Sequence, residues 1–364
     1  MVASPREVAV VGAGVVGLSA AAALGLRGAR VTTFDPEPPG SGQSFGPVRA
    51  FRVAHPTALG VDLAVRSLAL WSDWEQQWQR PLIRRHGLLM ADPESGLWAA
   101  RMSAAGQPFR LPSRADAAEL CPLVDADRLD PTELYFDPQA GAIDTRATIE
   151  WLLALNGDFG WRLVPEHVVA VRPSAGAGAA TGALVVAGGS KYRFDAAVVA
   201  AGAGTEALAE GLGLHLDTAP QQRTWAALRP HAPLPATAMW MQMLPGHRYG
   251  WAQMGVDGAV ALSGDWSSND PSDTAAGSFD AALDYAADLM PKLDPATARR
   301  REMLVAPVVV PGGQPFAIST VGAVTLVEGN QLFKFAPLLG HVLADAVVGQ
   351  LPPWVPAFAA VRPS

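Results

Sequence analysis

The stretch Val8-Ala9-Val10-Val11-Gly12-Ala13-Gly14-Val15-Val16-Gly17 lies near the start of the chain and decides the fold. Val8 to Val11 is short and apolar, which is typical of a buried parallel strand. Leu18 to Leu26 is rich in alanine and leucine and predicts a helix. Ala29 to Phe34 predicts a second strand, which closes on Asp35. We therefore expect a strand–helix–strand unit at this end of the sequence.

The glycines of this unit indicate a dinucleotide site. Gly12 permits the tight turn, Gly14 lets the backbone approach a pyrophosphate, and Gly17 allows the helix to pack on the strand. The helix N-terminus presents N–H groups and a partial positive charge to the phosphates. Asp35 can accept hydrogen bonds from ribose hydroxyls. The alternative is a glycine-rich turn that binds no nucleotide.

Composition limits the other possibilities. The chain has 364 residues, 49% of them hydrophobic and 17% charged, which excludes a disordered protein and suggests two domains at roughly 150 residues each. The net charge of -7 and the absence of a basic cluster argue against nucleic acid as a partner. The single cysteine, Cys121, excludes an internal disulfide and a multi-cysteine zinc site. The seven histidines are scattered, so we expect no metal.

Val8 to Leu26 is a 19-residue stretch without a charge, long enough to resemble a membrane span. Its glycines favour a buried strand followed by a buried helix. We therefore expect no membrane partner. No targeting signal is evident, so we expect a cytoplasmic protein.

The rest of the chain alternates helices and strands. Periodicity predicts helices over Val61–Gln79, Arg114–Leu120, Asp144–Leu155, Ser278–Leu289 and Pro337–Val348. It predicts strands over Gly87–Met90, Trp161–Val171, Ala183–Ala187, Tyr192–Ala201 and Thr320–Val327, and an antiparallel sheet from Trp225–Leu228, Ala238–Met243, Tyr249–Met254 and Ala259–Ser263. A nicotinamide dehydrogenase would continue as regular strand–helix units after the first one. This interleaving instead favours FAD, which lies extended across a protein.

Four segments, taken in order and at their spacing, match a known pattern: Val8–Asp35, Gly46–Arg52, Ala196–Gly204 and Asn330–Gly340. With them the chain resembles the monomeric sarcosine oxidase branch of the D-amino-acid-oxidase-like FAD family, over essentially its full length. The resemblance implies an α/β fold with two interleaved domains. A Rossmann-like FAD domain would take residues 1–85, 140–215 and 305–364. An antiparallel-sheet substrate domain, residues 86–139 and 216–304, would cover the reactive face of the flavin.

The resemblance also implies the residues of the substrate site. Arg52 and Lys334 would hold the substrate carboxylate, Tyr249 would hydrogen-bond the carboxylate or the amine, and Arg49 would lie beside the flavin. The residues support this in part, because a lysine among Leu332, Phe333 and Phe335 is costly to bury unless it meets an anion. Arginine offers a planar fork for a carboxylate. The alternatives are a snorkelling Lys334, an interdomain ion pair at Arg52, a surface Arg49 and a core Tyr249.

The cofactor contacts implied by the resemblance come from both ends and the middle of the chain. The helix after Pro337 would direct its N-terminal dipole at the flavin and stabilise the reduced form. The implied contact residues are Gly12, Gly14, Val16, Gly17, Asp35, Ser44, Val168, Gly202, Leu332, Phe333 and Lys334.

The sequence departs from the family pattern in three places. No cysteine lies in Val305–Val310, where this branch attaches FAD covalently, so we expect non-covalent FAD. Ala261 stands where close family oxidases carry a lysine that promotes reaction with oxygen, and Arg49 is the candidate replacement. Leu332 replaces a glycine, which puts the backbone there in doubt if its φ is positive.

Asp265 and Trp266 follow the position of the missing lysine, where the family has other polar residues. They indicate either a changed substrate pocket or an ordinary turn. Tryptophans at 225, 240, 251 and 266 favour a roomy aromatic pocket, although such side chains also fill cores.

The activity implied by the resemblance is oxidation of an amine or amino acid at the carbon bearing nitrogen, giving an imine. Molecular oxygen or another electron acceptor would reoxidise the flavin, and the protein would be a monomer or a small homo-oligomer. The alternatives are a flavin dehydrogenase with a non-oxygen acceptor, a protein whose flavin is not catalytic, and a nicotinamide-dependent dehydrogenase.

Overall fold

The computed structural model describes residues 7–175, 181–216, 218, 221–244, 248–255, 257–265, 275–305, 310 and 314–355. Two compact units divide the chain and are described separately. Unit 1 takes 1–45, 147–221 and 304–364, and unit 2 takes 46–146 and 222–303. The expected α/β fold with two interleaved parts is confirmed.

Unit 1 contains two sheets and four helices among the described residues. The larger sheet has the order β18-β19-β12-β1-β2-β8 and is parallel except for β18. The smaller is antiparallel, β11-β10-β9. The elements are β1 (Glu7–Val11), α1 (Val15–Leu26), β2 (Arg30–Phe34), α5 (Thr145–Asp158), β8 (Arg162–Val164), β9 (Val168–Ala175), β10 (Thr181–Ala187), β11 (Ser190–Phe194), β12 (Ala196–Val199), α6 (Thr205–Glu210), β18 (Phe316–Val321), β19 (Val324–Gly329) and α8 (Ala336–Val347).

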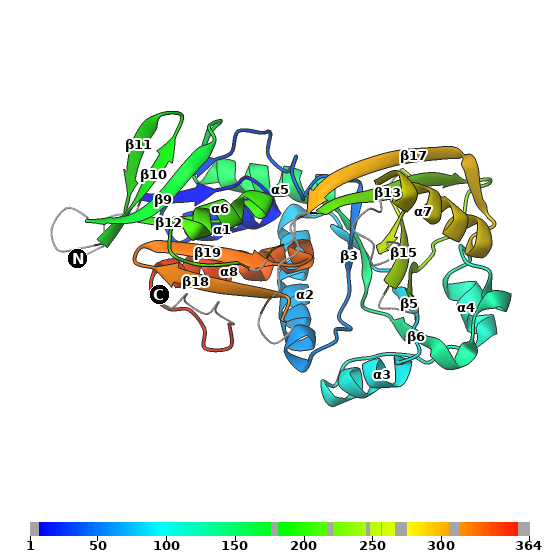
Figure 1. The fold of residues 1–364 in the computed structure, drawn as a ribbon. Coiled ribbons are helices and arrows are strands. Elements are labelled where there is room, and N and C mark those ends of the chain that lie inside the picture. The colour runs from blue at the N-terminus through cyan, green and yellow to red at the C-terminus, as the bar shows by residue number, and fades with distance from the viewer. Residues whose placement is uncertain are drawn as a thin grey trace. The chain divides into compact units, whose positions relative to one another are not determined.

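The strands and helices of unit 1 form three layers. Helices α1 and α8 lie side by side against the larger sheet (Figure 1). Gly340 makes this close approach possible, because a Cβ there would lie 2.6 Å from the Ser19 carbonyl oxygen. The other face packs on the smaller sheet around Phe34, Val171 and Val185. Helix α1 is buried from Val15 to Gly25, which explains its uncharged sequence.

Three predicted strands of unit 1 are each two strands. Trp161–Val171 divides into β8 and β9, which belong to different sheets and are separated at Pro165. Tyr192–Ala201 divides into β11 and β12 at Asp195, whose carboxylate accepts the Glu7 N–H at 2.9 Å. Thr320–Val327 is a β18–β19 hairpin, because Gly322 at φ 58° permits a two-residue turn. In each case a local break divides the predicted strand.

Unit 2 is built on a seven-stranded sheet of order β17-β13-β16-β15-β14-β5-β6 and a three-stranded sheet β3-β7-β4. The expected antiparallel sheet is present, and β14 pairs with β5 in parallel. The elements are β3 (Val48–Phe51), α2 (Ala58–Trp78), β4 (Ile83–Arg84), β5 (Leu88–Ala91), α3 (Ser95–Ala104), α4 (Arg114–Leu120), β6 (Leu134–Asp137), β7 (Gly141–Asp144), β13 (Gln221–Pro230), β14 (Met239–Leu244), β15 (Arg248–Met254), β16 (Val260–Asp265), α7 (Ala275–Leu289) and β17 (Leu293–Val305).

The small sheet explains a difference from the expected domain boundaries. Residues 46–85 and 140–146, which we expected in the FAD-binding domain, belong to unit 2 by their contacts. Both β3 and β4 pair with β7, and this pairing joins three segments that are far apart in sequence. In α2, Trp71 and Trp74 are buried, and their rings pack edge to face with centroids 5.2 Å apart.

The two faces of the seven-stranded sheet have different coverings. One face packs on α4 and α7 around Leu89, Trp240 and Leu262. On the other face, Met239 and Ala261 pack against Val48 and Ala142 of the small sheet. Side chains alternate between these faces along each strand.

Candidate functional site

The glycine-rich turn of unit 1 has the geometry that the sequence predicted. Gly12 has φ 106°, and a Cβ at this residue would lie 2.3 Å from the Ala200 carbonyl oxygen. The Gly12 N–H donates to Phe34 O at 2.9 Å, and the Ala13 N–H donates to Asp35 Oδ2 at 2.7 Å. Asp35 therefore holds the turn closed from the end of β2, a structural role that we did not predict for it.

Predicted cofactor residues converge at the N-terminus of α1. Gly14 is the N-cap residue, and no side chain of its own caps the helix. The Val15 N–H donates to Ser44 Oγ at 2.9 Å. Val16 and Gly17 belong to the first turn, whose N–H groups have no intrahelical acceptors. These N–H groups are suited to a phosphate.

Gly202 lies at the same edge of the larger sheet. It follows β12 in a short 3-10 turn with φ 57°, and a Cβ on it would lie 3.6 Å from Gln43 Nε2. Gln43 directly precedes Ser44 in sequence. Val168, by contrast, is the first residue of β9 and is buried in the core between the two sheets of unit 1.

Lys334 is buried in a 3-10 turn, Leu332–Phe335, that precedes α8. Its side chain is 3% exposed. The Nζ atom donates to Gln331 Oε1 at 3.3 Å and lies 5.3 Å from the Phe335 ring centroid. Phe333, in the same turn, is also buried.

The left-handed backbone conformation in this segment belongs to Gln331 and not to Leu332. Gln331 has φ 55° and occupies the left-handed region, whereas Leu332 begins the 3-10 turn and does not have a positive φ. The strained residue is therefore Gln331, whose side chain contacts Lys334.

Glu328 is a buried acid that sequence reasoning missed. It lies near the end of β19, it is 5% exposed, and burial raises its pKa to about 7. The neighbouring Thr205 side chain and the Gly329 backbone oppose this shift, and the charge of Glu206 adds to it. The signal was available in the sequence, since a single charge follows four apolar or β-branched residues at Val324–Val327.

Arg52 lies in unit 2, directly after β3. Its Nη1 donates to Ala54 O at 3.0 Å, and its guanidinium carbon lies 5.3 Å from the Trp98 ring centroid. The fully buried Asp137 carboxylate lies within electrostatic reach of this guanidinium. Burial raises the pKa of Asp137, and Arg52 and three backbone N–H groups oppose that rise.

Arg49 is a second arginine on this segment. It lies on β3, and its Nη1 donates to Val48 O at 2.8 Å. Burial lowers the pKa of Arg49 to about 10, so this is a desolvated guanidinium and not an ordinary surface arginine.

Tyr249 pairs through its backbone with Met243 and Asp265 in the seven-stranded sheet. The side chains of Tyr249 and Asp265, and the whole of Trp266, lie outside the described residues. Ala261 is 3% exposed and packs with Val48 and Trp225.

Two buried polar groups on the Ala261 face of the sheet were not predicted. The Tyr135 hydroxyl and Gln253 Oε1 have no hydrogen-bond partner among the described residues. Gln253 pairs directly with Ala261. Their signal in the sequence was faint, because neither residue stands out from the other residues of its strand.

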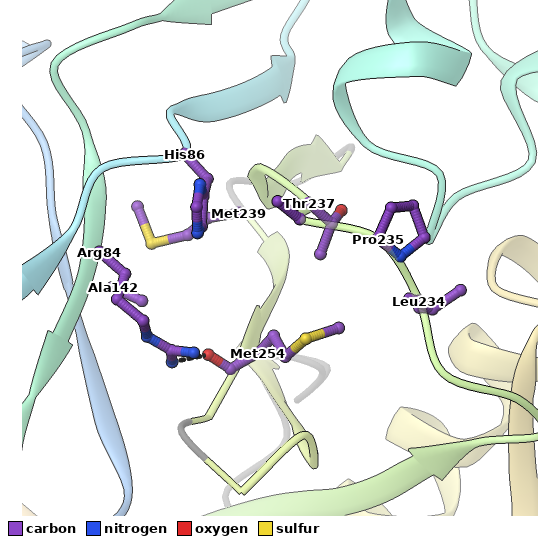
Figure 2. Close-up of a pocket in the computed structure, with 9 residues that line it drawn as sticks. Arg84, His86, Ala142, Leu234, Pro235, Thr237, Met239 and Met254 are labelled. Atoms are coloured by element: carbon purple, nitrogen blue, oxygen red, sulfur yellow. Dashed lines mark hydrogen bonds between the residues drawn. The ribbon is translucent and has the colours of Figure 1, made fainter.

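A pocket of about 160 Å³ opens in unit 2 between β4 and the strand ends of β14 and β15. Figure 2 shows Arg84 on one side, with its guanidinium donating to the Met254 carbonyl oxygen. The same guanidinium donates to Gly255 O at 3.1 Å, and His86 and Thr237 add polar groups to the lining. None of the predicted site residues lines this pocket.

Two kinds of site have no support in the described part of the chain. No cluster of three or more histidine, cysteine, aspartate or glutamate side chains there is arranged to hold a metal ion. No helix in the described ranges has the length and apolarity to cross a membrane.

Comparison with known proteins identifies the family. Residues 7–346 match the family described as FAD dependent oxidoreductase. The chain belongs to this FAD-dependent oxidoreductase family. The expected cofactor, FAD, and the expected enzyme class are thereby confirmed. No curated protein matches the chain.

Solved structures share the fold across nearly the whole chain. NikD, described as an unusual amino acid oxidase essential for nikkomycin biosynthesis, has a TM-score of 0.84 at 23% identity, covering 99% of this chain and 100% of NikD. L-proline dehydrogenase from P. horikoshii has a TM-score of 0.80 at 18% identity, covering 96% and 95%. Glycine oxidase from Geobacillus kaustophilus has a TM-score of 0.78 at 19% identity, covering 98% and 97%.

The residues of unit 1 fit the FAD of this family. The side-chain-free Gly14 leaves room for a pyrophosphate beside Ser44, since a Cβ on Gly14 would meet only Ser44 Oγ, at 3.2 Å. The N–H groups of Val16 and Gly17 in the first turn of α1 have no intrahelical acceptors and face the same need for a partner. Asp35 Oδ1 and Oδ2 each accept one backbone N–H and keep further acceptor capacity for a ribose hydroxyl. Of the predicted substrate residues, Lys334 lies in unit 1, and Arg52, Arg49 and Tyr249 lie in unit 2.

Proposed function

We propose that this oxidoreductase oxidises an amine or amino acid at the carbon that bears nitrogen and releases an imine. The observation that carries the proposal is the burial of the Lys334 ammonium, 3% exposed, in the turn before α8. A buried ammonium is stabilised by an anion, and an amino-acid carboxylate is the anion that such a site would take. Bound FAD would accept the hydride from the substrate carbon.

The side chains of this enzyme would act by positioning the substrate. Lys334 and Arg52 would hold its carboxylate, with Gln331 orienting the Lys334 ammonium and Asp137 orienting the Arg52 segment. Tyr249 would hydrogen-bond the carboxylate or the amine. Arg49 would lie beside the cofactor. Fixed orientation and electrostatic stabilisation would then supply most of the rate enhancement.

We also propose that the cofactor is held without a covalent bond. Cys121 is the only cysteine of the sequence, and its side chain is fully buried in the core of unit 2. Burial raises the pKa of this thiol to about 11, which disfavours the reactive thiolate. A thioether to FAD would require that thiolate.

The electron acceptor separates two candidate activities. Ala261 is packed among apolar side chains and supplies no charge, which favours a dehydrogenase that passes electrons to a carrier. Arg49 is a desolvated cation in the same unit and favours an oxidase, if it serves in place of the missing lysine. Air exposure of the dithionite-reduced protein distinguishes them: reoxidation within seconds indicates an oxidase, and persistence for minutes indicates a dehydrogenase.

One experiment tests the central proposal. The absorbance of the purified protein is recorded before and after acid precipitation, and the protein is then titrated anaerobically with L-, D- and N-methyl amino acids and with amines. We expect flavin in the supernatant and bleaching by one class of compound. A flavoprotein that none of them reduces would overturn the proposed activity.

A further inference from the structure

A row of side chains crosses the seven-stranded sheet on the face that carries Ala261. Tyr135 of β6 pairs with Met90 of β5, Met90 pairs with Met241 of β14, and Met241 pairs with Trp251 of β15. Trp251 pairs in turn with Ser263 of β16. Because directly paired residues point to the same face, Tyr135 shares this face with Trp251, and Tyr249 is two residues from Trp251 along β15.

Tyr135 is an unusual residue for this position. Its side chain is fully buried, and its ring stacks on Phe109 with centroids 6.0 Å apart and an interplanar angle of 10°. Its hydroxyl has no hydrogen-bond partner among the described residues. Buried hydroxyls nearly always have a partner, and an orphaned one is destabilising. A molecule that reaches this hydroxyl would supply the partner that the described residues do not.

The charges around Tyr135 indicate what that molecule is. Arg52 and Asp137 both act electrostatically on the phenol. The Asp137 carboxylate already accepts N–H groups from Val53, Ala54 and Gln139. Burial and the Asp137 charge raise the pKa of Tyr135, so its hydroxyl stays protonated and can donate.

We propose that Tyr135 is a substrate-binding residue whose hydroxyl, with the Arg52 guanidinium, donates a hydrogen bond to the carboxylate of the substrate. This inference rests on the proposed function, which places an amino-acid carboxylate at Arg52. Two neighbouring donors match the two oxygens of a carboxylate, whereas a neutral amide offers one acceptor oxygen and an unwanted donor. Tyr135 thus selects carboxylate-bearing substrates over plain amines.

The chain offers a matched control on the opposite face of the same sheet. The Tyr285 hydroxyl of α7 accepts from Trp240 Nε1 at 2.7 Å and donates to Gln242 Oε1 at 2.9 Å. Tyr285→Phe removes a paired hydroxyl from the same unit. Tyr135→Phe removes an unpaired one.

The experiment uses the FAD-loaded enzyme and follows the flavin absorbance while benzoate, acetate, benzamide or acetamide is added. We expect Tyr135→Phe to raise the Kd of the carboxylates about tenfold, as for loss of one hydrogen bond to a charged group, and to leave the amides unchanged. Tyr285→Phe leaves every Kd unchanged. In a double-mutant cycle with Arg52→Lys, the two losses of carboxylate-binding free energy are less than additive, because both groups bind one carboxylate.

Thermal unfolding shows whether Tyr135→Phe weakens ligand binding directly or by destabilising the fold. Tyr135→Phe retains or raises the melting temperature of the ligand-free holoenzyme, and Tyr135→Met serves as the second variant if the first does not fold. A carboxylate Kd in Tyr135→Phe within twofold of the wild-type value overturns the proposal and identifies the missing partner as water. A wild-type holoenzyme that binds neither carboxylate overturns it as well.

Anaerobic reduction distinguishes failure of this inference from failure of the proposed function. If an amino acid bleaches the wild-type flavin and Tyr135→Phe is bleached with the same concentration dependence, the proposed function stands and the role of Tyr135 is wrong. If no amine or amino acid bleaches the wild-type flavin, the proposed function fails and the role of Tyr135 fails with it.

Discussion

The Asp137 carboxylate accepts the backbone N–H of Val53 at 2.8 Å, although 84 residues separate the two in sequence. The same oxygen accepts the Ala54 N–H at 3.0 Å. These bonds fix the two residues that follow Arg52 to the end of β6. A single buried acid thus sets the position of the segment that carries the candidate carboxylate-binding arginine.

Asp137→Asn tests this relationship. Both carboxylate oxygens of Asp137 accept backbone N–H groups in the wild-type protein. In asparagine an NH₂ group replaces one of these oxygens and cannot accept, so at least one hydrogen bond is lost. We therefore expect the free energy of unfolding to fall by about 2 kcal/mol. Urea denaturation measures the change. Asp73→Asn, at an exposed position on α2, serves as the control and leaves stability unaltered. An Asp137→Asn protein as stable as wild type would contradict a positioning role for Asp137.

Gly14→Ala tests the fit of FAD to the turn before α1. The added methyl group contacts only Ser44 Oγ, so we expect the protein to fold normally. It occupies the space in which the backbone approaches the pyrophosphate, so the FAD Kd should rise at least tenfold, about 1.4 kcal/mol. Fluorescence titration of the apoprotein gives the Kd. Gly42→Ala, where a Cβ meets nothing within 4 Å, should leave it unchanged. Equal affinities in the two variants would argue for a different cofactor position.

Lys334→Met separates binding from stability. Removing a buried ammonium leaves the melting temperature equal or higher, because burial of an ion costs free energy that a methionine avoids. The concentration of amino acid needed to bleach the flavin rises at least tenfold, because one charged hydrogen bond to the carboxylate is lost. Lys191→Met, at an exposed position on β11, changes neither quantity. A strong loss of stability with unchanged substrate affinity would make Lys334 a structural residue.

Glu328→Gln tests a pH dependence of stability. With a folded pKa of about 7, above its ordinary value of 4.5, Glu328 keeps its proton in the folded state while the unfolded chain loses it. Its contribution to stability is therefore lost as pH rises from about 4.5 to about 7, and it stays lost above that. We expect Glu328→Gln to match wild type at pH 5 and to exceed it by about 3 kcal/mol at pH 8.

Urea denaturation across this pH range measures the Glu328 effect. Glu210→Gln, at an exposed position on α6, should follow the wild-type curve. Parallel curves for wild type and Glu328→Gln would show that Glu328 does not titrate in the folded protein between pH 5 and 8.

Local patterns predicted the elements whose pairing is also local. The apolar run Val8–Val11, the glycine turn and Asp35 belong to one strand–helix–strand unit, and the structure places them as expected. The pattern failed where a strand had to change sheets. Strands β11 and β12 are separated by Asp195 alone and belong to different sheets, which periodicity within the run Tyr192–Ala201 does not reveal.

Local sequence patterns could not predict the roles of the buried polar groups of unit 2. Tyr135 and Asp137 read as ordinary positions of one short strand, and their importance arises from Arg52 and Val53, more than 80 residues earlier. Likewise, nothing in the run Asn330–Lys334 shows that Gln331, and not Leu332, takes the left-handed conformation.

The sequence by itself determined the class of fold and the dinucleotide turn, because these depend on steric rules for glycine and on short-range periodicity. The FAD family followed from the resemblance of four sequence segments to a known family. Only the tertiary structure decided which polar groups are buried and what they contact: Glu328 beside Thr205, Asp137 beneath the Arg52 segment, and Tyr135 without a partner. The physical reason is that desolvation and hydrogen bonding are properties of an assembled environment. That environment is built from strands that pair across large distances in the sequence.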